Sequence, residues 1–325
     1  MKILITGASG YIGSELALRL ANKGFTVHAL LRSNNAEKYL RHPLIRLFKG
    51  DLLDKESISH AISGCQQVYH TAALVRKCSR DPYQFYLNNL RGTENILEQA
   101  LKHGVKKLVF TSTCGVWGAT GNFVFTEDNP RIAPYDNDYE LSKILAEKLV
   151  KEYGFKGLYT VIVNPSRVYG PGIDRYSNAL NRHINKWLTS RIIALPWRTS
   201  ASSNYAYISD VVDGHILAME KGLGGECYIL GGENVSFYEL FKAVSGFVTD
   251  RKFFIRIPQW ILQIWALYEA LKSRIKNTDP SVTMKMVSCI SHNSRYSSQK
   301  AIRQLGYQIT PFKDGILQTI NHLNK

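Results

Sequence analysis

The segment Tyr139-Glu140-Leu141-Ser142-Lys143 places a phenol and an ammonium four residues apart. On a helix, side chains at this spacing are neighbours on one face. A tyrosine has an unperturbed pKa of about 10, so it is a poor acid or base at neutral pH. A nearby cation favours the phenolate and lowers that pKa. We therefore expect Lys143 to lower the pKa of Tyr139, so that Tyr139 can exchange a proton with a substrate oxygen.

A glycine-rich turn follows the first predicted strand, at residues 2–6. It reads Gly7-Ala8-Ser9-Gly10-Tyr11-Ile12-Gly13, and a helical pattern continues to about Asn22. In a strand-turn-helix unit, Gly7 can supply the tight turn, Gly10 lets the backbone approach a pyrophosphate, and Gly13 lets the helix pack close to the sheet. The pyrophosphate would bind the free N–H groups of the helix start. The alternative is a tight turn that binds no ligand.

The end of the second predicted strand, at residues 25–31, indicates which dinucleotide binds. An acid there would bind the ribose hydroxyls of NAD, but the residue that follows Leu31 is Arg32. An arginine suits a 2′-phosphate, so NADP is preferred over NAD, unless Arg32 is a surface residue that never meets a cofactor. A third strand, at 44–52, carries Asp51, which could accept from an adenine amine or cap the helix that begins near Asp54.

Small and hydroxyl-bearing residues follow the next strands. The fourth strand, at 67–70, leads into Thr71-Ala72-Ala73, and the fifth, at 107–110, leads into Thr111-Ser112-Thr113. Small residues permit a flat ligand to approach, and the carboxyl ends of strands are where open α/β sheets bind ligands. Ordinary turn chemistry would also explain the hydroxyls. The helix predicted at 82–103 contains Asn88 and Asn89, and two such poor helix formers within a helix indicate a function.

A sixth strand is predicted at 158–163, after the helix at 136–153. The alternation of strand and helix predicts an α/β fold, a doubly wound parallel sheet with helices on both faces. The 325 residues suffice for one large domain, or for a domain with a smaller appendage. The five cysteines are scattered, which indicates a reducing compartment with neither a disulfide framework nor a metal site.

The net charge is +15, which suits anionic partners or an evenly solvated basic surface. We favour the second explanation over nucleic-acid binding, because no nucleic-acid module is present. The N-terminal apolar run is too short for a signal peptide, and no uncharged apolar run reaches the roughly 20 residues of a spanning helix. The expected location is cytoplasmic, with peripheral contact at the inner face of a membrane left open.

Taken together, these motifs resemble the extended short-chain dehydrogenase/reductase superfamily, or NAD-dependent epimerase/dehydratase family. The resemblance covers nearly the whole chain. Within the superfamily, the chain looks most like the dihydroflavonol-reductase-like and hydroxysteroid-dehydrogenase-like branches. The residues that carry it are Gly7–Gly13, Asp51-Leu52, His70–Ala73, Asn89–Thr93, Thr111–Gly118, Tyr139–Lys143, Pro165–Gly172, Tyr207–Asp213 and Glu226–Gly232.

The resemblance implies a set of site residues. Tyr139 matches the catalytic acid/base and Lys143 the lysine that holds the nicotinamide ribose. Thr113, or Ser112 if the register shifts by one, matches the hydroxyl that binds the substrate oxygen. Asn89 matches the asparagine that holds a proton-relay water. The implied cofactor contacts are Gly7, Ser9, Gly10, Tyr11, Ile12, Gly13, Arg32, Asp51, Leu52, Thr71, Ala72, Ala73, Tyr139, Lys143, Pro165 and Val168. Trp117 stands where the family usually has tyrosine.

The resemblance also implies a division of the chain. Residues 1–171 would form the dinucleotide-binding Rossmann domain, to which 204–230 partly return, and 172–325 would form mainly a smaller substrate-binding lobe. Candidate pocket residues there are Tyr176, Asn178, Arg182 and Tyr205.

One segment of that lobe, residues 251–276, stands out. Its basic residues flank an apolar stretch rich in tryptophan, with Glu269 as its one acid. Such a helix is most often packed into the protein as core. It could instead cover the pocket of a lipophilic substrate as a lid, or lie in a membrane interface.

The leading hypothesis is an NAD(P)-dependent oxidoreductase that transfers hydride between nicotinamide C4 and a ketone or secondary alcohol. Its substrate would be a small molecule, bulky and apolar or ring-containing. The alternative is a nucleotide-sugar epimerase with tightly bound NAD. Dehydration is disfavoured because Cys114-Gly115 stands where dehydratases usually carry an Asp-Glu pair. A non-catalytic dinucleotide sensor is a minor alternative. A homodimer through the helix that carries Tyr139 is left open.

Overall fold

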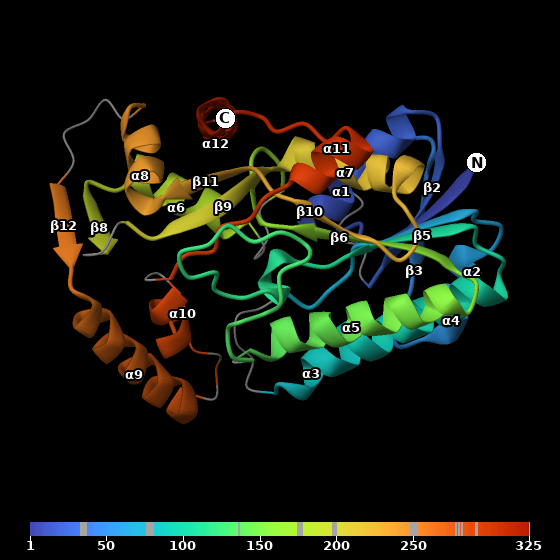
Figure 1. The fold of residues 1–325 in the computed structure, drawn as a ribbon, viewed down its shortest axis with the longest axis horizontal. Helices are drawn as coiled ribbons and strands as arrows, with labels where there is room; N and C mark the ends of the chain where they lie inside the picture. The colour runs from blue at the N-terminus through green and yellow to red at the C-terminus, as the bar shows by residue number, and fades with distance from the viewer. Residues whose placement is uncertain are drawn as a thin grey trace.

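The fold is a parallel sheet between two layers of helices, as predicted (Figure 1). The computed structural model describes the whole chain except residues 33–37, 76–80, 136, 174–177, 197–199, 248–252, 277, 279, 281, 290–291 and 325. Seven strands form the main sheet in the order β10-β6-β5-β4-β1-β2-β3, and all neighbours are parallel. Their bounds are Lys2–Thr6 (β1), Thr26–Leu31 (β2), Ile45–Lys49 (β3), Gln67–His70 (β4), Lys107–Thr111 (β5), Tyr159–Pro165 (β6) and Cys227–Leu230 (β10).

The central strands are apolar throughout because both faces of the sheet are covered. In β1, Ile3 and Ile5 belong to one buried cluster and Leu4 to the other, since successive side chains point to opposite faces. The first cluster includes α1 (Tyr11–Asn22) and α7 (Ile208–Lys221). The second includes α2 (Lys55–Ile62), α4 (Gly92–Lys102) and α5 (Asp138–Phe155). The carboxyl ends of the strands therefore remain as the place for a ligand.

Two predicted elements end or break differently in the structure. The third strand ends at Lys49, because the Asp51 carboxylate accepts from the Leu53 N–H at 2.9 Å and turns the chain. The helix predicted at 82–103 is three pieces: α3 (Tyr83–Phe85), a π-helical turn at Tyr86–Arg91, and α4. The π-helical turn contains both asparagines that the sequence singled out.

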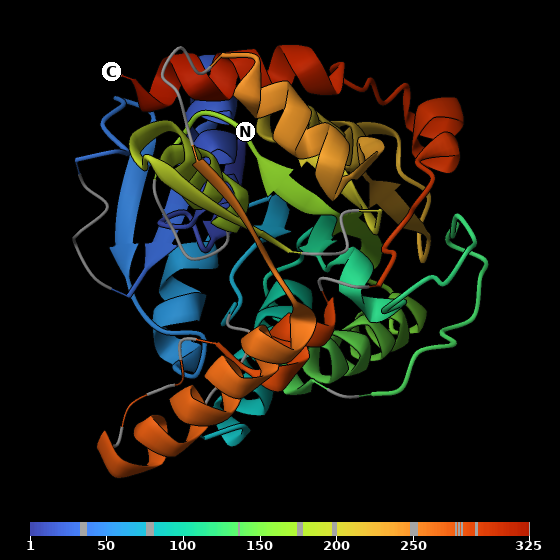
Figure 2. The same cartoon turned by 90° about the vertical axis from the view of Figure 1, so that its left-hand side faces the viewer.

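Two small sheets lie outside the main sheet, the three-stranded β11-β9-β7 and the two-stranded β12-β8 (Figure 2). The division into a Rossmann domain and a smaller lobe stays a prediction. Their strands span Arg167–Tyr169 (β7), Ile192–Pro196 (β8), Ser202–Tyr207 (β9), Glu233–Ser236 (β11) and Phe253–Ile257 (β12). The helices that follow α5, apart from α7, are Ala179–Thr189 (α6), Phe237–Ser245 (α8), Gln259–Lys276 (α9), Met284–Cys289 (α10), Gln299–Leu305 (α11) and Phe312–Leu323 (α12).

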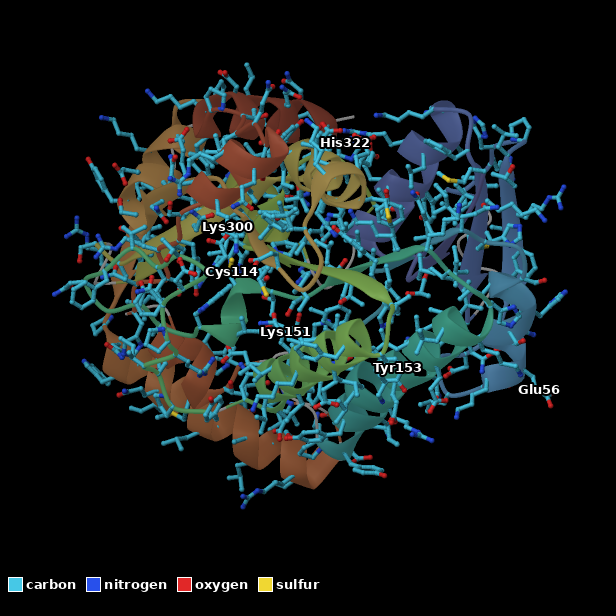
Figure 3. The ribbon with its side chains drawn as sticks, turned by 45° about the vertical axis from the view of Figure 1, so that its right-hand side comes forward. Glu56, Cys114, Lys151, Tyr153, Lys300 and His322 are labelled. Atoms are coloured by element: carbon cyan, nitrogen blue, oxygen red, sulfur yellow. The ribbon has the colours of Figure 1, made fainter. Side chains whose placement is uncertain are left out.

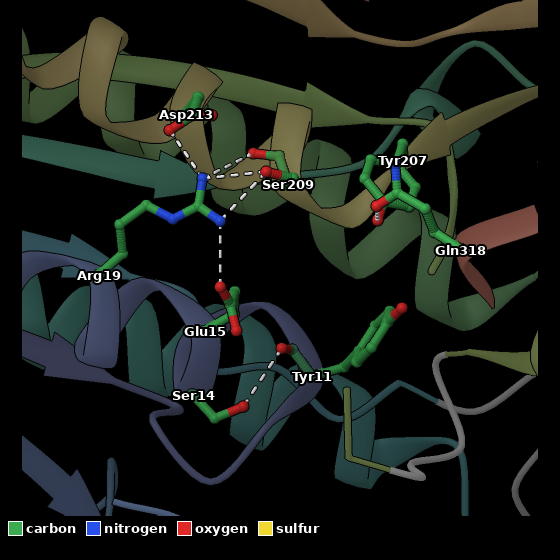
Figure 4. A network of polar contacts seen from close by, with 8 residues as sticks. All are labelled: Tyr11, Ser14, Glu15, Arg19, Tyr207, Ser209, Asp213 and Gln318. Atoms are coloured by element: carbon green, nitrogen blue, oxygen red, sulfur yellow. Dashed lines mark hydrogen bonds and ion pairs between the residues drawn. The ribbon is translucent and has the colours of Figure 1, made fainter. Parts of the chain in front are cut away.

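Arg19 ties the first helix to α7 (Figure 4). Its guanidinium donates to Asp213 on α7 at 2.8 Å and to Glu15, one turn earlier on α1, at 3.0 Å. It also donates to the Ser209 hydroxyl at 3.1 Å. Because the contacts with Ser209 and Asp213 join residues 190 or more positions apart, they fix α1, which begins at the glycine turn, against α7.

Candidate active site

The glycine turn is shaped by close contacts at two of its three glycines. Gly7 has a φ of +71°, and a Cβ there would lie 2.6 Å from the Ala72 nitrogen. A Cβ on Gly13 would lie 2.2 Å from the Gly7 carbonyl oxygen. Gly10 differs, because its backbone is extended and an added Cβ would meet only the Gly7 oxygen, at 3.0 Å. Packing within the protein therefore explains Gly7 and Gly13, whereas Gly10 has a single close neighbour.

The start of α1 fits a pyrophosphate. Gly10 is its N-cap residue, no side chain caps it, and no acidic residue lies in the first turn. The first N–H groups of a helix have no partner within the helix, so an uncapped start favours an anion. The Tyr11 side chain turns away and donates to the Gly170 carbonyl at 2.7 Å. Tyr11 would therefore serve the predicted cofactor contact through its backbone.

The residues expected at the adenosine end lie after β2 and β3. Arg32 is exposed immediately after β2. Asp51 does not cap α2, because Asp54 is the N-cap residue and accepts from the Glu56 N–H at 3.0 Å. The alternative prediction, that Asp51 caps the helix beginning near Asp54, is therefore wrong. Leu52 contributes its carbonyl to Asn95 at 2.8 Å, which holds the end of β3 against α4.

The loop after β4 is held against β1. Thr71 donates to the Thr6 carbonyl at 2.7 Å, and the Ala72 N–H donates to the Thr6 hydroxyl at 3.3 Å. Ala72 also makes the close approach to Gly7 described above. Thr71, Ala72 and Ala73 therefore lie next to the glycine turn, as a shared cofactor site requires.

Thr113 and Tyr139 come together at the end of β5. The Thr113 side chain is close enough to Tyr139 to oppose the rise in the pKa of that phenol, and the Thr113 hydroxyl accepts from the Gly115 N–H at 3.1 Å. The neighbouring Ser112 is buried, and its hydroxyl faces the Glu147 carboxylate. This geometry answers the question of register: Thr113 is the hydroxyl beside the phenol.

The expected lowering of the Tyr139 pKa by Lys143 is wrong for this structure. Burial raises the pKa of Tyr139, the neighbouring Glu140 raises it further, and only the hydrogen bond with Thr113 opposes them. The prediction rested on the nearby cation alone. Burial also removes water from around the phenol, and this loss disfavours the charged form. Tyr139 is therefore a neutral phenol, able to donate a proton.

Lys143 lies one turn further along α5 and is 1% exposed. Its ammonium donates to the Thr111 carbonyl at 2.7 Å and lies 4.0 Å from the centre of the Phe110 ring. Burial lowers the pKa of Lys143 to about 7, although Glu147 favours the charged form. A buried cation fixed at the carboxyl end of β5 is suited to hold a polar ligand group at this edge.

Asn89 links the loop after β4 to α5. Its side-chain oxygen accepts from the Leu74 N–H at 2.7 Å, and its nitrogen donates to the Ser142 hydroxyl at 3.0 Å. Ser142 in turn donates to the Tyr139 carbonyl at 2.7 Å. The side chain of Asn89 thus positions the turn of helix that carries Tyr139. The relay water assigned to Asn89 from the resemblance stays a prediction.

The sequence analysis missed Glu147 and Asn164. Asn164 donates to the Glu147 carboxylate at 2.7 Å and to the Thr113 carbonyl at 3.2 Å. Asn164, held by Glu147, thus fixes the Thr113 backbone and with it the position of the threonine hydroxyl. One signal could have identified Glu147, because it follows Lys143 by four residues and so lies on the same face of α5.

Cys114 also contacts this support. Cys114, which follows Thr113, donates to the Asn164 carbonyl at 3.2 Å. Figure 3 shows Cys114 with Lys151 and Tyr153, which lie on α5. The thiols of Cys65, Cys114 and Cys227 are free, and Cys78 and the Cys289 side chain lie outside the description. Among the described residues, no group of three or more His, Cys, Asp or Glu side chains could hold a metal ion.

The remaining predicted contacts lie at the end of β6. Pro165 is the last residue of β6, and Val168 lies in β7. Between them, the Ser166 hydroxyl is buried without a hydrogen-bond partner among the described residues. A polar ligand group could satisfy this hydroxyl, which adds a second observation that the cleft edge fits a polar cofactor.

Two of the four candidate pocket residues prove to be structural. Asn178 is 1% exposed and donates to the Ile173 carbonyl, and Tyr205 packs against Phe312 with ring centres 5.7 Å apart. Neither can line an open pocket, because their side chains are enclosed by protein. Arg182 is exposed on α6, and Tyr176 lies outside the described residues.

Trp117, the departure from the family pattern, is also mostly enclosed. It is 7% exposed, and its ring centre lies 6.3 Å from that of Tyr296. Tyr296 donates to the Gly118 carbonyl at 2.8 Å, so the pair joins the loop after Thr113 to the C-terminal segment.

The fold and this site define an extended short-chain dehydrogenase/reductase. The sequence model of the NAD dependent epimerase/dehydratase family matches residues 3–231, and the chain belongs to that family. The family's members include NAD-dependent dehydrogenases, reductases and epimerases, so the protein is an enzyme of this class.

Three relatives illustrate the range. A putative dihydroflavonol 4-reductase of Synechocystis is 27% identical, with 98% of this chain and 93% of the relative covered. Cinnamoyl-CoA reductase 1 of Petunia hybrida is 30% identical, with 99% and 92% covered. The structure of a UDP-glucose 4-epimerase of Thermus thermophilus in complex with NAD matches with a TM-score of 0.80 and 25% identity, covering 100% of this chain and 99% of that one.

Proposed function

We propose that the protein is an NAD(P)-dependent reductase of a ketone on a bulky, apolar or ring-containing small molecule. The observation that carries the proposal is that Thr113, Tyr139 and the buried Lys143 come together at the carboxyl edge of the sheet. Two of the compared relatives are named as reductases.

Each site residue has a separate role in the proposed reaction. The reduced nicotinamide, when bound, supplies the hydride to the carbonyl carbon. Thr113 donates a hydrogen bond that orients and polarises the substrate oxygen. As that oxygen gains negative charge, the Tyr139 O–H bond breaks and its proton moves to the oxygen, giving the alcohol. Lys143, whose ammonium is fixed on the Thr111 carbonyl at 2.7 Å, would hold a polar group of the cofactor beside the phenol.

The raised pKa of Tyr139 favours this direction. A neutral phenol is ready to donate, whereas oxidation of an alcohol needs a phenolate that accepts. Because burial and Glu140 both disfavour the phenolate, the site as folded is prepared for reduction.

We also propose that NADP is preferred over NAD. The support is Arg32, an exposed cation directly after β2, where the adenosine ribose of a dinucleotide would lie. The backbone at Gly10 and the uncapped start of α1 serve either dinucleotide equally, so Arg32 is the residue that distinguishes them.

A nucleotide-sugar epimerase with tightly bound NAD is the second candidate. It is favoured by the similarity to a UDP-glucose 4-epimerase along the whole chain, and Thr113, Tyr139 and Lys143 would serve its chemistry as well. A homodimer through α5 stays a prediction, which light scattering of the purified chain would test.

The deciding experiment measures cofactor binding and turnover on the same preparation. Calorimetry should give tighter binding of NADPH than of NADH, and the Arg32→Ala variant should remove the difference. NADPH should then be consumed in the presence of apolar cyclic ketones. NAD retained through purification, together with turnover of a UDP-sugar without net loss of cofactor, would instead establish the epimerase.

A further inference from the structure

Helix α9 has its large apolar side chains on the outside. Only Ala266, Glu269 and Ser273 are buried, although the helix is rich in tryptophan and leucine. The exposed large residues are Trp260, Ile261, Ile264, Trp265, Leu267, Tyr268, Leu271 and Ile275, each between 40% and 77% exposed. A helix of a water-soluble domain normally has the opposite arrangement. The core prediction is therefore wrong, because the large apolar side chains of α9 are exposed. The lid stays a prediction.

The exposed residues form one continuous surface. With 3.6 residues per turn, they cover an arc of roughly 160° around α9, and we call this arc the outward face. The preceding strand extends the apolar surface, since Phe253 is 71% exposed. Figure 2 shows α9 projecting from the body of the molecule, and it packs on α10.

Basic residues border the outward face. Arg274 lies at one edge of the arc, and Lys276 lies at the other, with Lys272 close to it. Arg274 and Lys276 are exposed. The only acid of α9, Glu269, faces the protein and pairs with Lys272 at 2.8 Å. The outward face therefore presents apolar surface with cations and no carboxylate from α9.

We propose that the outward face of α9 docks on the surface of an anionic phospholipid bilayer. An amphipathic helix of this kind lies in the plane of the interface, with its apolar side chains among the acyl chains and its cations at the headgroups. Trp260, Trp265 and Tyr268 suit the interface because they combine an apolar body with a polar tip. None of the helices in the described chain has the length and apolarity needed to cross a membrane.

Charge favours the bilayer over a second copy of the chain. In a symmetric dimer through α9, the cationic borders of the two outward faces would approach each other, and each chain carries a net charge of +15. Like charges brought together oppose association. Anionic headgroups instead complement both the borders and the net charge.

Sedimentation of the full chain with vesicles tests the proposal. We expect it to sediment with vesicles that contain phosphatidylglycerol and much less with pure phosphatidylcholine, and salt should weaken the binding. The double variant Leu267→Glu/Leu271→Glu should lower the partition coefficient by roughly tenfold or more. The matched control is Leu223→Glu/Leu317→Glu, which changes two exposed leucines elsewhere and should bind as the unchanged chain does.

A second pair of variants separates charge from apolar contact. Arg274→Gln/Lys276→Gln should weaken binding to anionic vesicles, whereas Lys148→Gln/Lys151→Gln removes the same charge from α5 and should have little effect. The proposal is overturned if the unchanged chain stays in the supernatant, if both leucine pairs act equally, or if light scattering shows a dimer that only Leu267→Glu/Leu271→Glu dissociates. Because no substrate is used, the result is independent of the proposed reaction.

Discussion

At the scale of single residues, the surroundings of Tyr139 matter more than its motif. The Tyr139 ring meets the Phe85 ring edge to face, with ring centres 6.3 Å apart, and Thr113 lies beside it. Loss of water around the phenol raises its pKa and keeps it neutral. Glu147 and Asn164 hold the threonine from below. The chemistry therefore depends on a neutral donor whose position is set by three segments of the chain.

Replacement of Tyr139 by phenylalanine tests this donor. The variant keeps the ring and its packing but loses the proton, so turnover should fall by at least about 10²-fold. Cofactor affinity measured by calorimetry should stay nearly unchanged. Tyr83→Phe is a suitable control, because Tyr83 is 63% exposed on α3. Full activity of Tyr139→Phe would remove the general acid from the mechanism.

At the scale of elements, two irregularities build the site. The π-helical turn at Tyr86–Arg91 places Asn89 between the loop after β4 and α5, where a regular helix would rotate it differently. The glycine turn brings α1 close to the loop at Ala72. Together, the π-helical turn and the glycine turn hold the carboxyl ends of β1, β4 and β5 in fixed positions relative to one another.

Alanine at Gly10 and Gly13 should separate ligand binding from folding. Gly10 has a backbone that alanine can adopt, so Gly10→Ala should change the free energy of unfolding by less than about 1 kcal/mol. It should weaken cofactor binding by roughly tenfold, because the Cβ enters the space for the pyrophosphate. Gly13→Ala should cost about 1–3 kcal/mol through its 2.2 Å contact with the Gly7 oxygen. Calorimetry and denaturant unfolding measure both, and an unchanged cofactor affinity in Gly10→Ala would argue against a pyrophosphate at this turn.

At the scale of the whole molecule, the C-terminal segment contacts both α7 and β7. Asp210, near the start of α7, accepts from both the backbone N–H and the hydroxyl of Thr310, each at 2.7 Å. Tyr169 packs against Phe312 with ring centres 5.5 Å apart. The last helix is thereby attached to the same layer as α1, which supports the glycine turn.

Stability of the whole molecule should depend on pH through buried bases. Burial lowers the pKa of His70 to about 3 and that of His215 to about 4, below the ordinary 6.5. The unfolded chain binds these protons first, so stability should fall as the pH drops below 6.5. Lys143, with a pKa of about 7 when folded and 10.5 when unfolded, should make stability rise between pH 7 and 10.5.

Denaturant unfolding of the unchanged chain and of Lys143→Met isolates the lysine contribution. Between pH 7 and 9, the free energy of unfolding of the unchanged chain should rise relative to that of the variant, by at most about 1.4 kcal/mol per pH unit. Below pH 6 the difference between them should be constant, because Lys143 is then charged in both states. Parallel curves from pH 6 to 9 would show that the ammonium is not desolvated as the structure indicates.

The sequence by itself determined the parallel sheet, the glycine turn and the placement of Tyr139 and Lys143 on one helix. These features follow from local rules, because apolar periodicity, the freedom of Gly7 and a four-residue helical spacing need no distant partner. The tertiary structure decided the rest. Burial by other segments set the direction of the Tyr139 pKa shift. The Ser112 side chain lies next to Glu147, which leaves Thr113 as the residue beside the phenol. The packing of Ala266 and Ser273 against the protein left the tryptophans of α9 exposed. Each of these depends on which surfaces meet in space, and a linear pattern does not encode that directly.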